Sequence, residues 1–509
     1  MNAKIHQQLA NRKSRIERRL DKKRLGNLDH PMFTAVNIHY QIADRTRGLA
    51  HGGIGAVHML ARRIGLIDAI NNKLHLLKIH LPYHESDHVL NLAYNALCDG
   101  TCLQDLELRR QDEVYLDALG ARRIPDPTTA GDFCRRFGAA DVHTLIDIIN
   151  SVRPRVWARQ PAAFFDLARI DMDGTLVPTD AECKQGIDIT YNGVWGYHPL
   201  VVSLANTGEV LSVLNRPGNR PSHEGAAAEV DRAMKVCLEG GFRKMLLRGD
   251  TDFSQTKHLD RWNADPRVQF IFGLDQTAAR HVLADDLQAA AWQELERPPR
   301  YEVKTQPRRK PTRVKEEIVR QREFENKRLV SEYVAEMPYR PVACKNTYRL
   351  IVVRKNLSVK KGELRLFDDY IYFFYLTNDQ TSTPAAIVFE ANQRCNQENL
   401  NAQLKGGVRA LTAPVDNLES NWAYMVMTAL AWNLKAWFAL WPTEGPGRHI
   451  ERHQQEKQTI LGMEFKTFIN AFLRVPCQIV NAGRRSIYRV LSWNPWQRTF
   501  FRTIAQLRC

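Results

Sequence analysis

Three acidic residues, far apart along the chain, are of a type and in settings that suit metal-dependent chemistry on phosphodiesters. Asp173 ends the apolar segment 168–173, Asp250 follows the apolar segment 244–248, and Glu398 lies in a later polar segment. Transfer at a phosphodiester uses two divalent ions about 4 Å apart, one at the attacking oxygen and one at the leaving oxygen. Magnesium prefers oxygen ligands, so such a site gathers carboxylates from distant segments. Asp173, Asp250 and Glu398 are therefore the candidate catalytic and metal-binding residues.

The first two aspartates are predicted to end strands. In the strand over 168–173, Ile170 and Met172 point to one face, and Asp171 and Asp173 point to the other. Two carboxylates on one face of an apolar strand are costly without a cation or a partner. Sites in parallel sheets open at the carboxyl ends of strands, which suits Asp250. Asp171 is an alternative candidate for the first metal ligand, in place of Asp173.

The glutamate is predicted to lie on a helix over 390–405 that also carries two cations. At about 100° per residue, Glu398 and Lys405 fall within roughly 40° of Arg394 on the helix surface. An arginine and a lysine beside a carboxylate suit a surface that binds metal and also holds phosphates. An ordinary solvated face with an ion pair would look similar. The order of two strand-end aspartates followed by a helical glutamate favours the functional interpretation.

The elements that must position these residues indicate an α/β fold. The patterns predict three strands, a helix, a strand, a helix and a strand between residues 168 and 272, which is the order of a ribonuclease-H-like core. Residues 300–380 predict a β-rich insertion before the last core helix. The expected catalytic domain with this insertion spans 160–415, and a helical C-terminal region follows over 416–509.

The residues before the catalytic domain are expected to form two parts. Residues 1–50 are polar and basic and predict a flexible arm, and residues 51–155 predict a helical DNA-binding domain. In the latter, Pro127 precedes a helix that Thr128 or Thr129 could cap and that carries Arg135 and Arg136. These two arginines are candidate DNA-binding residues. A plain helical bundle fits the same pattern.

Composition narrows the class of protein. Lys and Arg number 72 against 56 Asp and Glu, a net charge of +16, which favours a polyanionic partner such as DNA. The most apolar stretch, 422–441, is interrupted by Asn433 and Lys435 and predicts a buried helix, with no membrane association. The N-terminus lacks the apolar run of a secretory signal, and nine scattered cysteines suggest reduced thiols. A cytoplasmic location is expected.

Together these residues match a known signature. Arg394, Glu398 and Lys405 have the spacing of a Tyr-x2-Arg-x3-Glu-x6-Lys motif, although Ala391 stands at the tyrosine position. Asp173, two residues before a threonine, and Asp250, after an apolar strand, match the other two acidic motifs. The chain thus resembles the DDE transposases of bacterial insertion sequences. Further segments resemble the insertion-sequence 1380 family: Tyr191-Asn192-Gly193, Arg216-Pro217-Gly218-Asn219 and Phe272-Gly273-Leu274.

The resemblance implies a mechanism and partners. It implies Mg²⁺ at the three carboxylates, with Mn²⁺ able to substitute, and cut-and-paste DNA transposition. One strand is cut at the element's end, and the freed 3′-hydroxyl attacks the opposite strand or target DNA. Arg394 and Lys405 would hold phosphates near the cut. A homodimer would bridge two ends, the N-terminal block would bind the terminal inverted repeats, and the protein would be nucleoid-associated.

Two other functions also fit parts of the sequence. Residues 171–176 resemble the nucleophile motif of haloacid-dehalogenase-like phosphatases, with Asp171 as nucleophile, Asp173 as general acid and Asp250 on magnesium. That fold normally opens with this motif, whereas about 170 residues precede it here, and it leaves the basic surplus unexplained. A catalytically decayed DNA-binding protein is the second alternative. The presence of all three carboxylates argues against it.

Overall fold

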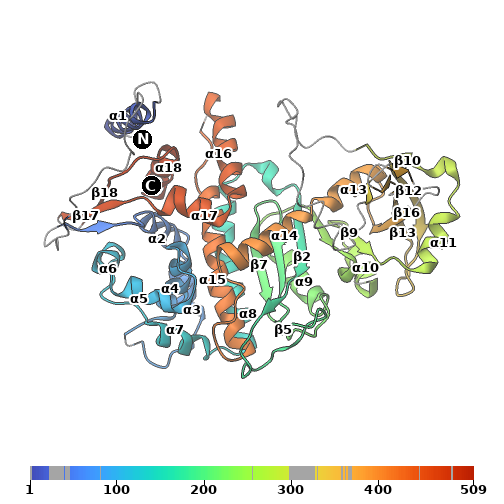
Figure 1. Cartoon of the computed structure of the whole chain (residues 1–509), viewed down its shortest axis with the longest axis horizontal. Helices are drawn as coiled ribbons and strands as arrows, with labels where there is room; N and C mark the ends of the chain where they lie inside the picture. Colours follow the sequence, from blue (N-terminus) through green and yellow to red (C-terminus); the bar gives the residue numbers. More distant parts are fainter. Residues whose placement is uncertain are drawn as a thin grey trace.

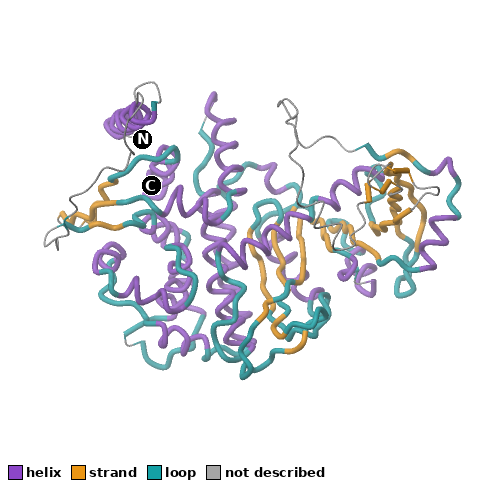
Figure 2. Tube along the Cα trace, in the orientation of Figure 1, coloured by secondary structure: helices purple, strands orange, loops and turns teal. Residues whose placement is uncertain are grey.

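A computed structural model describes residues 3–21, 39, 46–80, 82–254, 256–296, 327–328, 331–356, 359–360, 363–364, 370–445, 447–482 and 485–508. Much of the expected arm over 1–50 and the first part of the expected insertion lie outside these ranges. The described chain is a mixed α/β structure, mostly helical on the left of the view, with the strands of a large sheet and further helices around them in the centre and on the right (Figures 1 and 2).

The sheet has nine strands in the order β10-β12-β13-β16-β9-β8-β2-β6-β7. In its centre, β2 is parallel to β8 and β8 is parallel to β9, while all other neighbours are antiparallel. Parallel neighbours end at the same edge, so the carboxyl ends of β2 and β8 lie together. The strands are β2 (Ala168–Gly174), β6 (Leu200–Leu204), β7 (Glu209–Leu214), β8 (Met245–Gly249), β9 (Val268–Leu274), β10 (Gln293–Glu294), β12 (Ser331–Tyr339), β13 (Tyr348–Asn356) and β16 (Tyr370–Thr377).

The long strands of the expected insertion are not an independent β unit. β16 pairs with β9, with Phe374 opposite Leu274 and Leu376 opposite Phe272, so β12, β13 and β16 extend the central sheet. The alternation that predicted these strands also buries Tyr372, Phe374 and Leu376. A strand pattern does not specify its partner, and for this reason the sequence did not predict the continuous sheet.

Helices of the N-terminal block pack against the C-terminal half of the chain (Figure 1). In particular, α4 and α8 lie against the long helix α15, and α8 also contacts α9 and β7 of the sheet layer. The helices up to β9 are α1 (Ala3–Leu20), α2 (Ile54–Arg63), α3 (Leu66–Lys73), α4 (Glu85–Leu97), α5 (Leu106–Arg110), α6 (Glu113–Leu119), α7 (Pro127–Cys134), α8 (Ala139–Trp157), α9 (Ala226–Glu239) and α10 (Thr256–Asn263). Those after β9 are α11 (Ala278–Asp285), α13 (Pro384–Asn392), α14 (Cys395–Ala402), α15 (Leu418–Leu440), α16 (Ile450–Gly462), α17 (Phe465–Phe468) and α18 (Gln497–Arg508).

Helix α15 is the predicted buried helix, and this prediction is confirmed. Within the described part of the chain, no helix is long and apolar enough to cross a membrane. The polar residues that interrupt the apolar run of α15 have partners inside the protein. The Asn433 amide accepts from the backbone N–H of Val210 at 2.8 Å and donates to its carbonyl at 3.0 Å, and Lys435 Nζ donates to Leu461 O at 2.8 Å. These bonds offset the cost of burying polar groups.

The expected continuous helix over 390–405 is instead built in pieces. α13 is capped by the Thr383 hydroxyl and ends at Asn392, a residue disfavoured in helix interiors. α14 starts at Cys395 and passes into a π-helical turn over Gln403–Gly407. Arg394 therefore stands at the junction of two helices, and Lys405 lies in the π turn.

The two ends of the chain depart from expectation and lie side by side (Figure 1). The 416–509 region is not wholly helical, because β17 (Cys477–Ala482) and β18 (Arg485–Val490) form a hairpin that pairs with β1 (Gly48–Leu49). Alternate residues of β17, among them Cys477 and Ile479, are buried. Residues 3–20, expected in a flexible arm, form helix α1. Its Arg12 donates to Val490 O and Ser492 O at 2.8 and 3.0 Å, a long-range contact that local sequence patterns do not reveal.

Candidate active site

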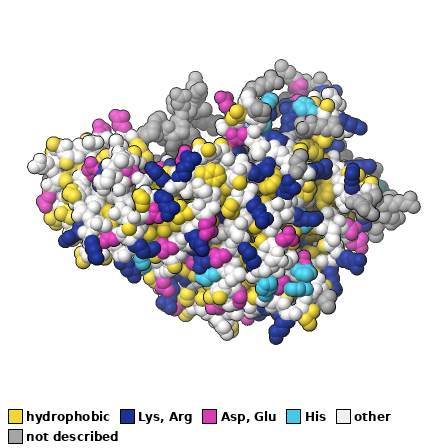
Figure 3. Space-filling model, turned by 180° about the vertical axis from the view of Figure 1, so that it is seen from behind, with side chains coloured by type: hydrophobic (Ala, Val, Ile, Leu, Met, Phe, Trp, Pro, Cys, Tyr) yellow, Lys and Arg dark blue, Asp and Glu magenta, His cyan; other side chains and the backbone are white. Residues whose placement is uncertain are grey.

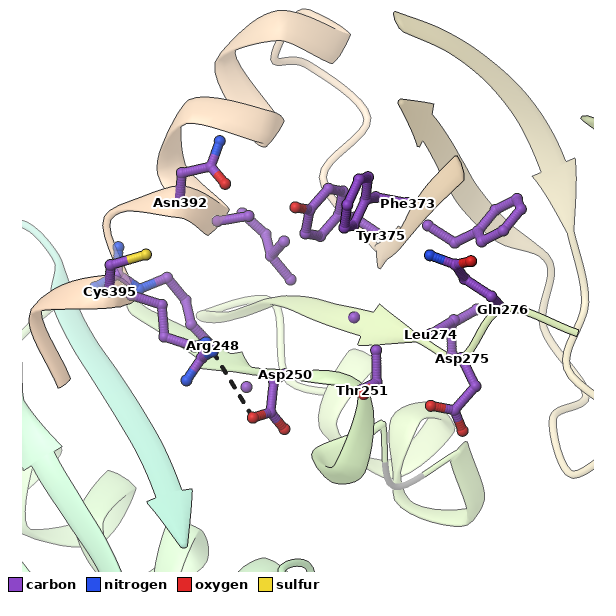
Figure 4. Close-up of a pocket in the computed structure, with 16 residues that line it drawn as sticks. Arg248, Asp250, Thr251, Leu274, Asp275, Gln276, Phe373, Tyr375, Asn392 and Cys395 are labelled. Atoms are coloured by element: carbon purple, nitrogen blue, oxygen red, sulfur yellow. Dashed lines mark ion pairs between the residues drawn. The ribbon is translucent and has the colours of Figure 1, made fainter. Parts of the chain in front are cut away.

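The three predicted acidic residues converge where β2, β8 and α14 meet. Asp173 is near the end of β2, Asp250 follows β8 directly, and Glu398 lies on α14. Arg394 lies among them: its guanidinium nitrogens are 4.0 Å from Asp173 Oδ1, 3.7 Å from Asp250 Oδ2 and 3.9 Å from Glu398 Oε1. Figure 4 shows the Asp250 side of this cluster, where the dashed line marks the ion pair with Arg394. One cation thus faces three carboxylates.

The electrostatics of the two aspartates are unusual. Asp173 is 15% exposed, and Asn401 Nδ2 donates to its Oδ2 at 2.9 Å. Burial raises the pKa of Asp173 to about 7, and the nearby Asp250 and Glu398 add to the rise while Arg394 opposes it. Burial also raises the pKa of Asp250. Buried carboxyls with raised pKa values in a cleft are candidates for a functional site.

The chemistry of these donors suits a hard divalent ion, but their arrangement keeps the oxygens apart. Among the described residues, no group of three or more His, Cys, Asp or Glu side chains is placed so that it could hold a metal ion. The guanidinium of Arg394 lies between the carboxylates at distances longer than hydrogen bonds, and its buried Nη1 has no hydrogen-bond partner among the residues that the structure describes. Glu398 is 64% exposed, so its side chain has room to turn toward the aspartates. The three carboxylates thus suit Mg²⁺ or Mn²⁺ by ligand type, although in this arrangement they do not form a metal-binding group among the described residues.

Lys405 reaches the same site even though the helix is interrupted. It lines an open cleft of about 890 Å³ together with Asp173 and Asp250. Burial lowers the pKa of Lys405, and the charge of Asp173 opposes this change. The structure thus brings Arg394, Lys405 and the three carboxylates together. Asn401, three residues after Glu398 on α14, is a further site residue that the sequence analysis missed.

Behind the cleft lies a second ion-pair cluster that was not predicted. Arg248 Nε and Nη2 each donate to the carboxylate of Asp171 at 2.7 Å, and Arg248 Nη1 donates to Glu390 Oε1 at 2.8 Å and to its carbonyl at 2.9 Å. Burial raises the pKa of Asp171, and Arg248 opposes the rise. Asp171 is almost fully buried and is not among the residues that line the cleft. A charged arginine inside the apolar strand 244–248 was the available signal.

The candidate DNA-binding arginines lie elsewhere. Arg135 follows the end of α7 and pairs with Asp132 and Asp416 at 2.8 Å each, and neither it nor the exposed Arg136 lines the carboxylate cleft. The helix before them is capped by Asp126, whose carboxylate accepts the N–H of Thr129, and not by Thr128 or Thr129 as expected. An Asp-Pro pair at a helix start is a known signal for this cap.

The position of the signature tyrosine is part of a second pocket. Ala391 lines a pocket of about 450 Å³ next to Asp250 and Arg394, together with the aromatic residues Phe373 and Tyr375 of β16 (Figure 4). Aromatic side chains thus border this position from a neighbouring strand.

Comparison with known proteins assigns the chain to a family. The sequence profile described as "Transposase DDE domain group 1" matches residues 46–509, so the chain belongs to the DDE transposases. It is accordingly a transposase, an enzyme of DNA transposition, and a phosphatase function is not favoured. Transposases of this class use divalent metal ions. None of the curated proteins compared with the chain matches it.

One solved structure that resembles the chain is a "Cryo-EM structure of piggyBac transposase synaptic complex with hairpin DNA". It is 10% identical, with a TM-score of 0.36, and the match covers 91% of this chain and 86% of that chain.

Proposed function

We propose that Asp173, Asp250 and Glu398 are the catalytic carboxylates of a cut-and-paste transposase of the insertion-sequence 1380 type. The chain would cut DNA at the ends of an insertion sequence and join them to target DNA. The observation that carries the proposal is the convergence of three carboxylates from three separate elements around one guanidinium, within 4.0 Å of it. The open cleft beside them provides room for a DNA strand.

The proposed cofactor is Mg²⁺, with Mn²⁺ able to substitute. When bound, two divalent ions activate the attacking oxygen and stabilise the leaving oxygen of a phosphodiester. Asn401 orients the carboxylate of Asp173 through its hydrogen bond. Arg394 and Lys405, at the same cleft, are the cations that would hold phosphate oxygens of the DNA.

The fold proposed for the catalytic domain is ribonuclease-H-like. The strand order β7-β6-β2-β8-β9 supports it, with an antiparallel β2-β6-β7 meander followed by two parallel strands. Helices α9 and α10 connect to these parallel strands. The segments 191–193 and 216–219, which resemble the insertion-sequence 1380 family, lie on the rim of the cleft.

The proposed partners are the terminal inverted repeats, target DNA and a second copy of the chain. The net charge of +16 favours a polyanion, and Lys and Arg side chains are spread widely over the face seen in Figure 3. The helical block over 51–155, with Arg135 and Arg136, would bind the repeats, and a homodimer would hold two ends. Such a protein would be nucleoid-associated.

A cleavage assay tests the proposal. Purified full-length protein is incubated with Mg²⁺ and labelled DNA that carries the ends of the element encoding the chain. We expect cleavage at the end, and its loss in Asp173→Asn, Asp250→Asn and Glu398→Gln while DNA binding persists. Arg135→Ala, at a residue that does not line the cleft, is expected to cleave normally once DNA is saturating. Binding without cleavage by the wild-type chain would indicate a decayed transposase and overturn the proposal.

A further inference from the structure

Large apolar side chains are exposed on a short hairpin at the rim of the cleft. The hairpin runs over 188–197, from β4 (Asp188–Ile189) to β5 (Trp195–Tyr197). Tyr191 is 85% exposed and Trp195 is 52% exposed, and Ile189 and Val194 are exposed as well. All ten tryptophans lie in the described part of the chain, and of these only Trp195 is exposed. Neighbouring exposed apolar side chains mark an interaction surface.

The hairpin belongs to the cleft that contains the carboxylates. Ile189 and Tyr191 line this cleft together with Asp173, Asp250 and Lys405. Ile189 and Trp195 are directly paired across the two antiparallel strands, so their side chains share one face of the hairpin. A DNA strand that brings a phosphodiester to the aspartates therefore passes beside these side chains.

The hairpin is held rigidly in place. The Thr190 hydroxyl accepts the N–H of Val194 at 3.1 Å and donates to its carbonyl at 2.7 Å, and Gly193 has a φ of +80° that only glycine adopts without strain. Gly218 fits closely against the strands, because a Cβ there would lie 2.4 Å from Asp188 O. Gly193 and Gly218 therefore each have a local structural role in the hairpin and the loop beside it. A rigid aromatic platform loses little conformational entropy when it binds.

The loop that supports the hairpin also supplies positive charge. Buried Arg216 donates from Nη1 to the carbonyls of Ser222 and Glu224 at 2.8 and 2.7 Å, which holds the loop over 217–224. Arg220 on this loop is half exposed and lines the cleft. Arginine beside exposed aromatic rings is the combination that binds unstacked nucleotides, since the rings stack on any base and the cation pairs with phosphate.

We infer that the 188–197 hairpin is a DNA-binding element, and that Tyr191 and Trp195 stack on bases next to the phosphodiester that is cut. The inference rests on the proposed function, since it needs DNA in the cleft. An apolar protein partner would have to bury Arg220, Lys405 and the carboxylates against its surface at high cost. A nucleotide matches both the cations and the aromatic faces.

The first test measures base stacking directly. The full-length chain is bound, with Ca²⁺ in place of Mg²⁺, to end DNA in which 2-aminopurine replaces each base around the cut in turn. We expect a fluorescence change at one or two of these positions, and lower acrylamide quenching of Trp195 on binding. Tyr191→Ala and Trp195→Ala should abolish the 2-aminopurine change, whereas Tyr191→Phe and Trp195→Phe should retain it. Val282→Ala, an exposed apolar residue on α11, is the matched control and should change nothing.

The second test separates stacking from a structural role. Loss of a stacking ring corresponds to about a 5- to 150-fold loss, so cleavage by the two alanine variants should fall by that factor at unchanged melting temperature. On DNA with two mismatched pairs at the cut, the alanine variants should recover most of the loss, whereas Asp173→Asn should not. Equal loss on both DNAs, or normal stacking signals in the variants, would overturn the inference. Loss of dimerisation with intact DNA signals would instead assign the hairpin to contact between copies of the chain.

The two proposals can fail separately. If the wild-type chain binds end DNA but does not cut it, the proposed function fails while the 2-aminopurine signal still tests the hairpin. If the wild-type chain cuts and the alanine variants do so equally well, only the inference about the hairpin fails.

Discussion

Two arginine–carboxylate clusters lie one behind the other at the end of the sheet, and they differ in how fully they are satisfied. Arg248, which is 2% exposed, makes hydrogen bonds of 2.7–2.9 Å to Asp171 and Glu390. Arg394 faces three carboxylates at 3.7–4.0 Å, and one of its buried nitrogens has no hydrogen-bond partner within the described part of the chain. Arg248 with Asp171 and Glu390 therefore forms a closed structural clamp. The same residue types form a loose cluster at Arg394, which faces Asp173, Asp250 and Glu398.

The difference follows from depth along the strands. Asp171 and Asp173 share a face of β2, but Asp171 lies inside the sheet and Asp173 near the end of the strand. Inside, Arg248 joins β2 and β8 to α13 through the bonds to Asp171 and Glu390. At the end, the carboxylates are not fully compensated by Arg394, and the open cleft can admit metal ions and DNA. The clamp thus supports the elements from which the loose cluster projects.

The largest expected effect comes from neutralising the loose cluster. Asp250→Asn should reduce Mg²⁺-dependent cleavage by about 10³-fold or more, because an essential member of a catalytic unit is removed. The free energy of unfolding should not fall, because the substitution removes a carboxyl whose charged form is disfavoured by burial, as its raised pKa indicates. Asp265→Asn, on an exposed turn, is the control and should leave cleavage unchanged. Cleavage rate and urea unfolding measure the two quantities; a variant that unfolds easily would contradict the distinction between the clusters.

Breaking the clamp should instead cost stability. Arg248→Met leaves the buried Asp171 without its partner, and such losses amount to about 3–5 kcal/mol in the free energy of unfolding. Arg153→Met is the matched control, because its buried ion pair with Glu209 lies away from the cleft. Both variants should unfold at lower urea concentrations than the wild-type chain. At temperatures where both stay folded, only Arg248→Met should weaken Mn²⁺ binding, measured by titration calorimetry.

A milder effect is expected from Arg394→Gln. Its contacts are longer than hydrogen bonds, so its loss should lower the free energy of unfolding by less than the loss of Arg248. Cleavage should fall by about 10- to 100-fold, because a charge-assisted phosphate contact is lost. The measurement is the rate of cleavage beside urea unfolding. A stability loss as large as that of Arg248→Met would show that the two clusters do not differ as described.

The last prediction concerns pH. The pKa of Asp173 is raised from 3.8 to about 7, so the folded state favours its protonated form. The contribution of Asp173 to folding stability is complete below about pH 4 and is lost as the pH rises through 7. The free energy of unfolding of the metal-free protein should therefore fall over this range. A metal ion must replace the proton, so Mn²⁺ affinity should rise between pH 6 and 8. Melting temperatures with and without Mn²⁺ test both trends, and Asp173→Asn should remove them.

Local patterns were sufficient for much of the site. The strands that carry Asp173 and Asp250 follow from alternation and apolar runs, and the pairing of Arg394 with Glu398 follows from their spacing of four residues. The buried helix α15 was predicted from an apolar stretch interrupted by two polar residues. In each case the relevant contacts lie within a few residues or within one element.

Contacts between distant segments were not predictable in the same way. Arg248 meets Asp171 and Glu390 across 77 and 142 residues, and its pattern alone showed only a charge in an apolar strand. Local patterns likewise did not predict that β16 pairs with β9, that β17 and β18 form a hairpin, or that α1 contacts the C-terminal region.

The sequence by itself determined which residues are candidates for the chemistry, because residue type, period and spacing are properties of the chain. Only the tertiary structure decided that Asp171 is enclosed by Arg248 while Asp173 lines the cleft, and that Tyr191 lines the same cleft. The physical reason is that backbone geometry sets local periodicity, whereas burial and charge compensation depend on which distant elements meet.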